Sequence, residues 1–202
     1  MTYSIVPRDP KSGEMGVAVQ TDWFAVGNVV TWAEPGVGAV ATQSFAEVSY
    51  GPLGLDLMRG GKTAPEALRA LLAGDSGEAM RQVGMVDTSG RIAAHTGTAC
   101  VEAAGNVAGD GVTVQANMME RDTVWGAMLE AFQESDERLA ERLVAALVEV
   151  PVRAGEGSLR ALSSEHLELL RRELPLPLLF GLRDLDHHVP PSNGSERAAT
   201  TL

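Results

Sequence analysis

The sequence is poor in cysteine and lysine and contains no long hydrophobic run. Its one cysteine, Cys100, excludes an internal disulfide and therefore a secreted cystine scaffold. Only two of its 16 basic residues are lysines, Lys11 and Lys62, so no polybasic membrane-binding segment is available. No apolar run approaches the roughly 18 residues that cross a bilayer, and the first residues lack the pattern of a signal peptide. These absences predict a cytoplasmic protein that binds no membrane.

Positive charge is also scarce over the chain as a whole. The 202 residues include 27 acidic and 16 basic side chains, which gives a formal net charge of −11. A nucleic-acid groove requires a basic surface, so no nucleic-acid partner is expected. The hydrophobic share of 45 % is that of an ordinary globular protein, and the length suits one sizeable domain.

Several familiar catalytic motifs are missing as well. No G-x-S-x-G elbow is present, and no C-x-x-C or H-E-x-x-H spacing marks a metal site. Ser76 lies in a Gly-Asp-Ser-Gly stretch, but it precedes His95, whereas in chymotrypsin-like proteases the histidine comes first. We therefore expect no metal and no cofactor.

Short apolar runs alternate with turn residues in the first half of the chain. They predict strands at 3–8, 15–20, Val26–Trp32, Val37–Thr42, Arg81–Asp87, Arg91–His95 and Val112–Gln115. Helical patterns occupy Pro52–Arg59, a segment from a capping box at Thr63 to Leu72, and residues 121–134 and 136–148. This order of strands and helices favours an α+β sandwich of two packed sheets with helices outside.

The composition changes after residue 150. Residues 1–150 form the predicted domain, residues 151–186 an extension with one helix, and residues 187–202 a disordered tail rich in small and polar residues.

The N-terminus carries the strongest chemical signal. Thr2 follows the initiator Met1 and is small enough for Met1 to be removed. A free N-terminal threonine holds a nucleophilic hydroxyl and a base, its own α-amine, which titrates near pH 7.7 to 8.0. Thr2 is therefore a candidate nucleophile at the start of a predicted strand.

The order of several short motifs resembles the family catalogued as domain of unknown function 1028. The motifs are Thr2-Tyr3-Ser4-Ile5-Val6, Gly36-Val37-Gly38-Ala39-Val40-Ala41-Thr42-Gln43, Ser49-Tyr50-Gly51-Pro52, Arg81-Gln82, Ala94-His95-Thr96-Gly97 and Val114-Gln115-Ala116-Asn117-Met118. The resemblance covers roughly residues 2 to 148. It implies the four-layer αββα sandwich of N-terminal-nucleophile (Ntn) hydrolases, with Thr2 as the nucleophile.

The same resemblance suggests further site residues. Thr21 and Asp22 occupy a place similar to that of the aspartate after the second strand in the proteasome-like branch of Ntn hydrolases. The lysine of that branch is missing from Val29-Val30-Thr31-Trp32. Asn117 or Gln115, with Gln43 next, are candidates for a side-chain amide that stabilises an oxyanion. His95 is a candidate for substrate binding or for a second acid–base role.

A departure from the family lies at the C-terminal end. Family members usually continue after the last helix with a Gly-Asp-x-Arg-Gly-x-Gln-Ser-Ala-Ala run, and nothing like it follows Val150.

Two functions remain open at this point. In one, the protein is an amidohydrolase that cleaves a small amide or N-acyl compound through Thr2. In the other, it is a non-catalytic binding or assembly module on the same fold. The apolar strands are compatible with a homo-oligomer.

Overall fold

The computed structural model describes residues 1–148, which form two four-stranded antiparallel sheets and five α-helices. The first sheet has the strand order β2-β1-β8-β7. Its strands are β1 (Thr2–Pro7), β2 (Ala18–Thr21), β7 (Gly105–Gly109) and β8 (Val112–Asn117). The first and the last of the described strands, β1 and β8, are neighbours in the centre of this sheet, with β2 and β7 at its edges.

The second sheet has the order β3-β4-β5-β6 and consists of neighbours in the sequence. Its strands are β3 (Thr31–Glu34), β4 (Gly38–Ser44), β5 (Arg81–Asp87) and β6 (Ile92–Thr96). A short 3₁₀ turn, η1 (Glu78–Met80), leads into β5. The predicted pairing of residues 81–87 with 91–95 in a hairpin is confirmed.

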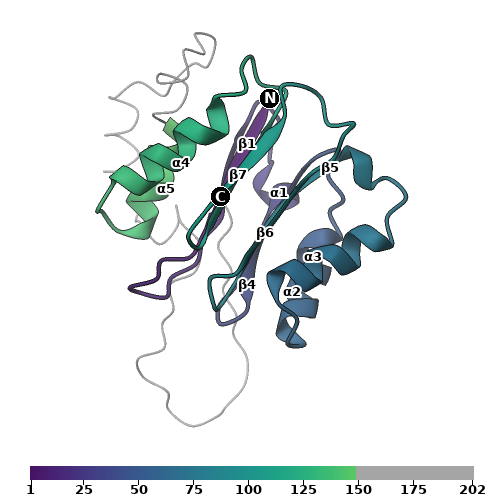
Figure 1. The fold of residues 1–202 in the computed structure, drawn as a ribbon, viewed down its shortest axis with the longest axis horizontal. Helices are drawn as coiled ribbons and strands as arrows, with labels where there is room; N and C mark the ends of the chain where they lie inside the picture. Colours follow the sequence, from purple (N-terminus) through teal and green to yellow (C-terminus); the bar gives the residue numbers. More distant parts are fainter. Residues whose placement is uncertain (149–202) are drawn as a thin grey trace.

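Helices cover the outer face of each sheet. On the second sheet lie α2 (Tyr50–Arg59) and α3 (Ala64–Ala73), and on the first lie α4 (Val124–Glu134) and α5 (Leu139–Val148). Figure 1 shows the two helical pairs on opposite sides, with the sheets between them. The prediction of a mixed α+β fold with two packed sheets is confirmed.

Alternation along the strands explains this layering, because successive side chains of a strand point to opposite faces. In β1, Tyr3 and Ile5 pack under α4 and α5, whereas Val6 packs between the sheets against Ala39 and Val86. Helix α3 begins at the predicted capping box: Thr63 accepts a hydrogen bond from the Glu66 backbone, and the Glu66 carboxylate accepts one from the Thr63 backbone.

Two predictions about the strands were wrong or incomplete. The strand expected at Val26–Trp32 begins only at Thr31, because residues 27–30 form the short helix α1 (Gly27–Val30). This turn is held by backbone hydrogen bonds from Val29 and Val30 to Val26 and by the Thr31 hydroxyl, which donates to Gly27. Strand β7 was missed because Gly-Asn-Val-Ala-Gly carries little β propensity of its own.

The helix boundaries also moved by a few residues, since α2 begins before the predicted Pro52 and α4 and α5 begin later than predicted. The linker, helix and tail predicted after residue 150 lie outside the described residues.

Candidate functional site

Thr2 is the first residue of β1 and lies between the two neighbouring strands of the first sheet. It is directly opposite Thr21, the last residue of β2, and Asn117, the last residue of β8. Residues directly opposite one another in antiparallel strands share a face of the sheet, so the three side chains lie together. The Thr2 and Thr21 hydroxyl oxygens are 2.9 Å apart, and Thr21 donates to the Met1 carbonyl oxygen at 2.8 Å. Three of the predicted site residues therefore meet at one point.

Behind Thr2, the space between the sheets holds a cluster of side-chain amides formed by Gln43, Gln82 and Asn117. The Gln82 Nε2 donates to the backbone carbonyl oxygens of Gly105 and Ala116 at 3.2 and 2.9 Å, which fixes the orientation of its amide. Gln82 Oε1 then accepts from Gln43 Nε2 at 2.7 Å and from Asn117 Nδ2 at 2.9 Å. The cluster ties the second sheet to the strand that pairs with Thr2.

This arrangement settles which amide hydrogens are engaged. Gln43 Nε2 also donates to the Gln115 carbonyl oxygen at 3.2 Å, so both of its hydrogens have acceptors. The bond from Asn117 to Gln82 uses one of its two amide hydrogens. Gln43 Oε1 and Asn117 Oδ1 are buried and have no hydrogen-bond partner among residues 1–148. Of these two amides, only Asn117 keeps a hydrogen beyond these bonds, but Asn117 is fully buried and does not line the cavity described next.

Gln115 lies deeper between the sheets than the other predicted amides. Its Nε2 donates to the Ser4 hydroxyl at 2.7 Å, and its Oε1 accepts from Thr113 at 3.2 Å. The Gln115 amide fits against Gly84 of β5, where an added Cβ would lie 2.4 Å from Gln115 Oε1. Gln115 therefore supports the packing of the sheets and does not line the cavity described next.

A cavity of about 600 Å³ opens beside Thr2. Thr2, Thr21 and Gln43 contribute to its wall, and apolar side chains make up most of the rest. These apolar residues are Trp23, Phe24, Val26, Val29, Val30, Phe45, Ala46, Val101 and Met118. The volume is in the range of small-molecule sites.

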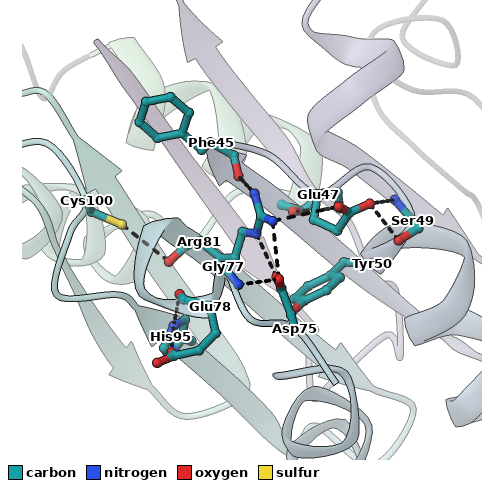
Figure 2. A network of polar contacts seen from close by, with 11 residues as sticks. Phe45, Glu47, Ser49, Tyr50, Asp75, Gly77, Glu78, Arg81, His95 and Cys100 are labelled. Carbon is teal, nitrogen blue, oxygen red and sulfur yellow. Dashed lines mark hydrogen bonds and ion pairs between the residues drawn. The ribbon is translucent and has the colours of Figure 1, made fainter. Parts of the chain in front are cut away.

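Among the described residues that line the cavity, Arg81 alone is charged, and the carboxylates of Asp75 and Glu47 already face it (Figure 2). Its Nε lies 2.7 Å from Asp75 Oδ2, and its Nη2 lies 3.9 Å from Glu47 Oε2. Its Nη1 donates to the Phe45 carbonyl oxygen at 2.8 Å, which holds the segment after β4 against the cavity. The hydrogen bond from Arg81, followed by one from the Gly77 backbone, lowers the pKa of Asp75 to about 2. Asp75 in turn raises the pKa of Arg81.

The backbone around the cavity is strained. Among residues 1–148, three residues other than glycine have a positive φ angle: Ala25 at 57°, Ser44 at 67° and Met118 at 57°. Ser44 and Met118 line the cavity, and Ala25 lies between its lining residues Phe24 and Val26. A left-handed conformation is costly for residues with a Cβ and is often found at functional sites. The concentration of all three here singles out this end of the molecule.

The structure places two of the predicted site residues at the margin or away from the cavity. Asp22 is an exposed residue whose Oδ2 accepts a hydrogen bond from the Met1 α-amine at 3.3 Å. His95, on the edge strand β6, contacts Glu78 through the backbone oxygen at 2.9 Å and the carboxylate at 3.1 Å. His95 does not line the cavity, so a direct role at Thr2 has no geometric support.

Neither Gln82 nor Arg81 was predicted from the sequence as a site residue. Gln82 is a polar residue inside an apolar strand, and that contrast was the available signal. No such signal exists for Arg81, because its role depends on Asp75 and Glu47 in other segments. Within residues 1–148 no three histidine, cysteine or acidic side chains gather in a way that could hold a metal ion. In the same range no helix is long and apolar enough to cross a membrane.

Comparisons with known proteins agree with this architecture. No curated protein matches the sequence. The crystal structure of a Silicibacter pomeroyi protein assigned to DUF1028 is 33 % identical, with a TM-score of 0.72, and the match covers 75 % of this chain and 70 % of that one. The model of the family described as a family of unknown function, DUF1028, matches residues 2–179, which extends past the end of α5. The chain therefore belongs to the DUF1028 family.

Proposed function

We propose that this protein is an amidohydrolase of the N-terminal-nucleophile type, with Thr2 as its nucleophile. The observation that carries the proposal is the position of Thr2, whose hydroxyl contacts Thr21 at the wall of an apolar cavity. The layered arrangement of two sheets between helical pairs is consistent with the αββα sandwich of that class. Removal of Met1 would free the α-amine that the mechanism requires.

The proposed reaction proceeds in two steps. The Thr2 α-amine takes the hydroxyl proton while Oγ1 attacks the amide carbonyl carbon, and the resulting oxyanion accepts a hydrogen bond from Asn117 Nδ2 or a backbone N–H. The C–N bond then breaks, and the leaving amine takes the proton from the α-ammonium. In the second step water attacks the Thr2 ester and the α-amine accepts the water proton. The bond between the acyl carbon and Thr2 Oγ1 then breaks, Oγ1 takes the proton from the α-ammonium, and the acid leaves.

Thr21 has a supporting part in this proposal. Its hydroxyl is within hydrogen-bond distance of Thr2 Oγ1, so it orients the nucleophile. When Met1 is removed, Thr21 loses its present acceptor, the Met1 carbonyl oxygen. Its hydrogen then becomes available to the Thr2 oxygen or to the substrate.

The first experiment is an intact mass measurement before and after treatment with a β-lactone that acylates N-terminal threonine. We expect a chain without Met1 that gains one adduct on Thr2, and no adduct on Thr2→Ala. Retention of Met1 would contradict the mechanism, because Thr2 would then have no free amine. A processed chain that gains no adduct would contradict the nucleophilic role of Thr2.

A second candidate function is favoured by the placement of Met1. The Met1 side chain packs against the core beneath α4 and α5, and its α-amine is held by Asp22. A protein that keeps Met1 in this position would be a binding or assembly module on the same fold. The mass measurement separates the two functions directly.

A further inference from the structure

The cavity beside Thr2 combines exposed apolar side chains with a lack of unbalanced charge. The protein has only three Trp, two Tyr and four Phe residues, yet Trp23, Phe24 and Phe45 all line this cavity. Their exposed fractions are 75 %, 98 % and 57 %, respectively. Clusters of exposed large apolar side chains are uncommon on soluble proteins unless they bind something.

The interior of the cavity has the same character as its rim. Val26, Val29 and Val30 enter it from the short helix α1 and the residue before it. The strained residues Ala25 and Ser44 are the sequence neighbours of Phe24 and Phe45. The energetically unfavourable backbone conformations therefore occur at the positions that place these aromatic side chains in the cavity wall. The polar contribution comes mainly from the Thr2 and Thr21 hydroxyls and from the Gln43 amide.

The electrostatics exclude a strong preference for a charged ligand. Arg81 is the charged lining residue, and Asp75 and Glu47 already neutralise it from 2.7 and 3.9 Å. Its Nη1 is occupied by the Phe45 carbonyl oxygen. A carboxylate entering this cavity would lose its hydration while Arg81 stays paired with Asp75 and Glu47, and an ammonium would find no carboxylate among the described lining residues.

We infer that the cavity selects neutral amides whose acyl group is aromatic or branched aliphatic, and disfavours amides with a charged acyl group. This inference rests on the proposed function, since it assigns the substrate class of the same site. The apolar acyl group occupies the space among Val29, Phe45 and Trp23, and the amide lies beside Thr2. The inferred class fits both the volume and the lining of the cavity.

Ligand binding can be tested separately from turnover in Thr2→Ala, which removes the nucleophile. The probes are 3-phenylpropionamide, the small amide acetamide and the anionic amide succinamate. Trp23 lines the cavity and serves as a fluorescent reporter, with Trp23→Phe identifying its signal. We expect 3-phenylpropionamide to bind at least about tenfold more tightly than either other amide, a difference that burial of one aromatic group readily supplies.

Two valines of similar exposure, one in the cavity wall and one outside it, allow a matched test with an introduced charge. Val29 lines the cavity and is 38 % exposed, whereas Val48 does not line it and is 41 % exposed. Val29→Asp in the Thr2→Ala background should weaken binding of 3-phenylpropionamide about tenfold or more, and Val48→Asp should leave it unchanged. Equal effects of the two substitutions would overturn the assignment of the cavity.

Binding and turnover measurements together distinguish a failure of the inferred substrate class from a failure of the proposed hydrolase activity. Binding of 3-phenylpropionamide without any amide turnover by the native chain would support the cavity assignment and count against the hydrolase. Turnover in which succinamate or acetamide is preferred would support the hydrolase and overturn the inferred class. Absence of binding and of turnover would overturn both.

Discussion

The Thr2 and Thr21 hydroxyl oxygens lie 2.9 Å apart on neighbouring strands. This contact links the proposed nucleophile to a side chain that lines the same cavity and is 19 residues away in the sequence. The β1–β2 pairing fixes it, since Thr2 and Thr21 are directly opposite each other. A hydroxyl in this position can orient the nucleophile without being consumed in the reaction.

Replacement of Thr21 by valine should therefore lower kcat and leave the fold intact. Valine has nearly the same shape but cannot exchange a hydrogen bond with Thr2. We expect kcat to fall about 10- to 100-fold, which corresponds to the loss of one positioning hydrogen bond. The measurement is amide turnover together with the thermal unfolding midpoint of each variant.

Thr113→Val is the matched control for this change. Thr113 is a buried threonine in β8 whose hydroxyl bonds to Gln115, away from the cavity wall. The Thr113→Val variant should have a lower unfolding midpoint than the wild-type protein and an unchanged kcat. If both variants lost turnover equally, the effect would be one of folding, and Thr21 would have no special role.

Gln82→Leu should strongly destabilise the protein. The substitution leaves Gln43 and Asn117 without their shared acceptor. It also removes the donor to the Thr96 hydroxyl and to the Gly105 and Ala116 carbonyl oxygens. Each buried group left unpaired costs about 1 to 3 kcal/mol, so we expect a loss of at least about 2 kcal/mol of unfolding free energy. Urea denaturation followed by circular dichroism measures it.

Asn106→Leu provides the comparison for an exposed amide. Asn106 donates to Thr96 at 2.8 Å, but it is exposed to solvent that replaces the lost bond. Its loss should cost no more than about 0.5 kcal/mol. Similar losses for Gln82→Leu and Asn106→Leu would mean that the amide cluster adds little to stability.

Much of the fold was predictable because its signals are local. The capping box at Thr63 and the hairpin of β5 and β6 each lie within a short segment, and both are confirmed. The strand expected at Val26–Trp32 was wrong before Thr31, because the β-branched valines there belong to a helical turn that places them in the cavity wall and the core. Tertiary packing overrode local propensity at this site.

The site was only partly predictable for a different reason. Thr2 and Thr21 could be identified from the sequence, and their contact follows from simple strand pairing. The amide cluster depends on the contact of Gln43 with Gln82, 39 residues away, and on the contact of Gln82 with Asn117 of the other sheet. Which of several buried amides faces which acceptor is a property of the packed sheets.

Acid should remove the contribution of the Asp75–Arg81 pair to stability. The pKa of Asp75 falls from its usual 3.8 to about 2 in the folded protein, chiefly through the hydrogen bond from Arg81. A carboxyl group whose pKa is lowered on folding stabilises the protein above its unfolded pKa, and this stability is lost as pH falls through the folded pKa. The loss should therefore occur between about pH 4 and about pH 2.

The variant Asp75→Asn isolates this effect. The wild-type protein should be more stable than Asp75→Asn near neutral pH, and the difference should shrink as the pH is lowered through that range. Urea denaturation at several pH values measures the difference. Tyr50→Phe removes only the hydroxyl that donates to Asp75 at 3.0 Å. The difference in unfolding free energy between wild type and Tyr50→Phe should therefore change less with pH. A difference between wild type and Asp75→Asn that is the same at every pH would contradict the ion pair.

Two helical glycines should respond to alanine with opposite signs. Gly51, buried in α2, lies so close to Trp32 that an added Cβ would be 2.2 Å from the indole Cγ. Trp32 cannot easily withdraw, because its indole also donates to the Val29 carbonyl oxygen at 3.1 Å. Gly51→Ala should therefore destabilise the protein by about 1 to 3 kcal/mol, as overpacking does. Gly126 is exposed in α4, and no atom of residues 1–148 lies within 4 Å of an added Cβ, so Gly126→Ala should stabilise the protein by about 0.5 to 1 kcal/mol through helix propensity. Thermal unfolding of the two variants measures both effects, and a stabilising Gly51→Ala would show that the second sheet and α2 pack less closely than the structure describes.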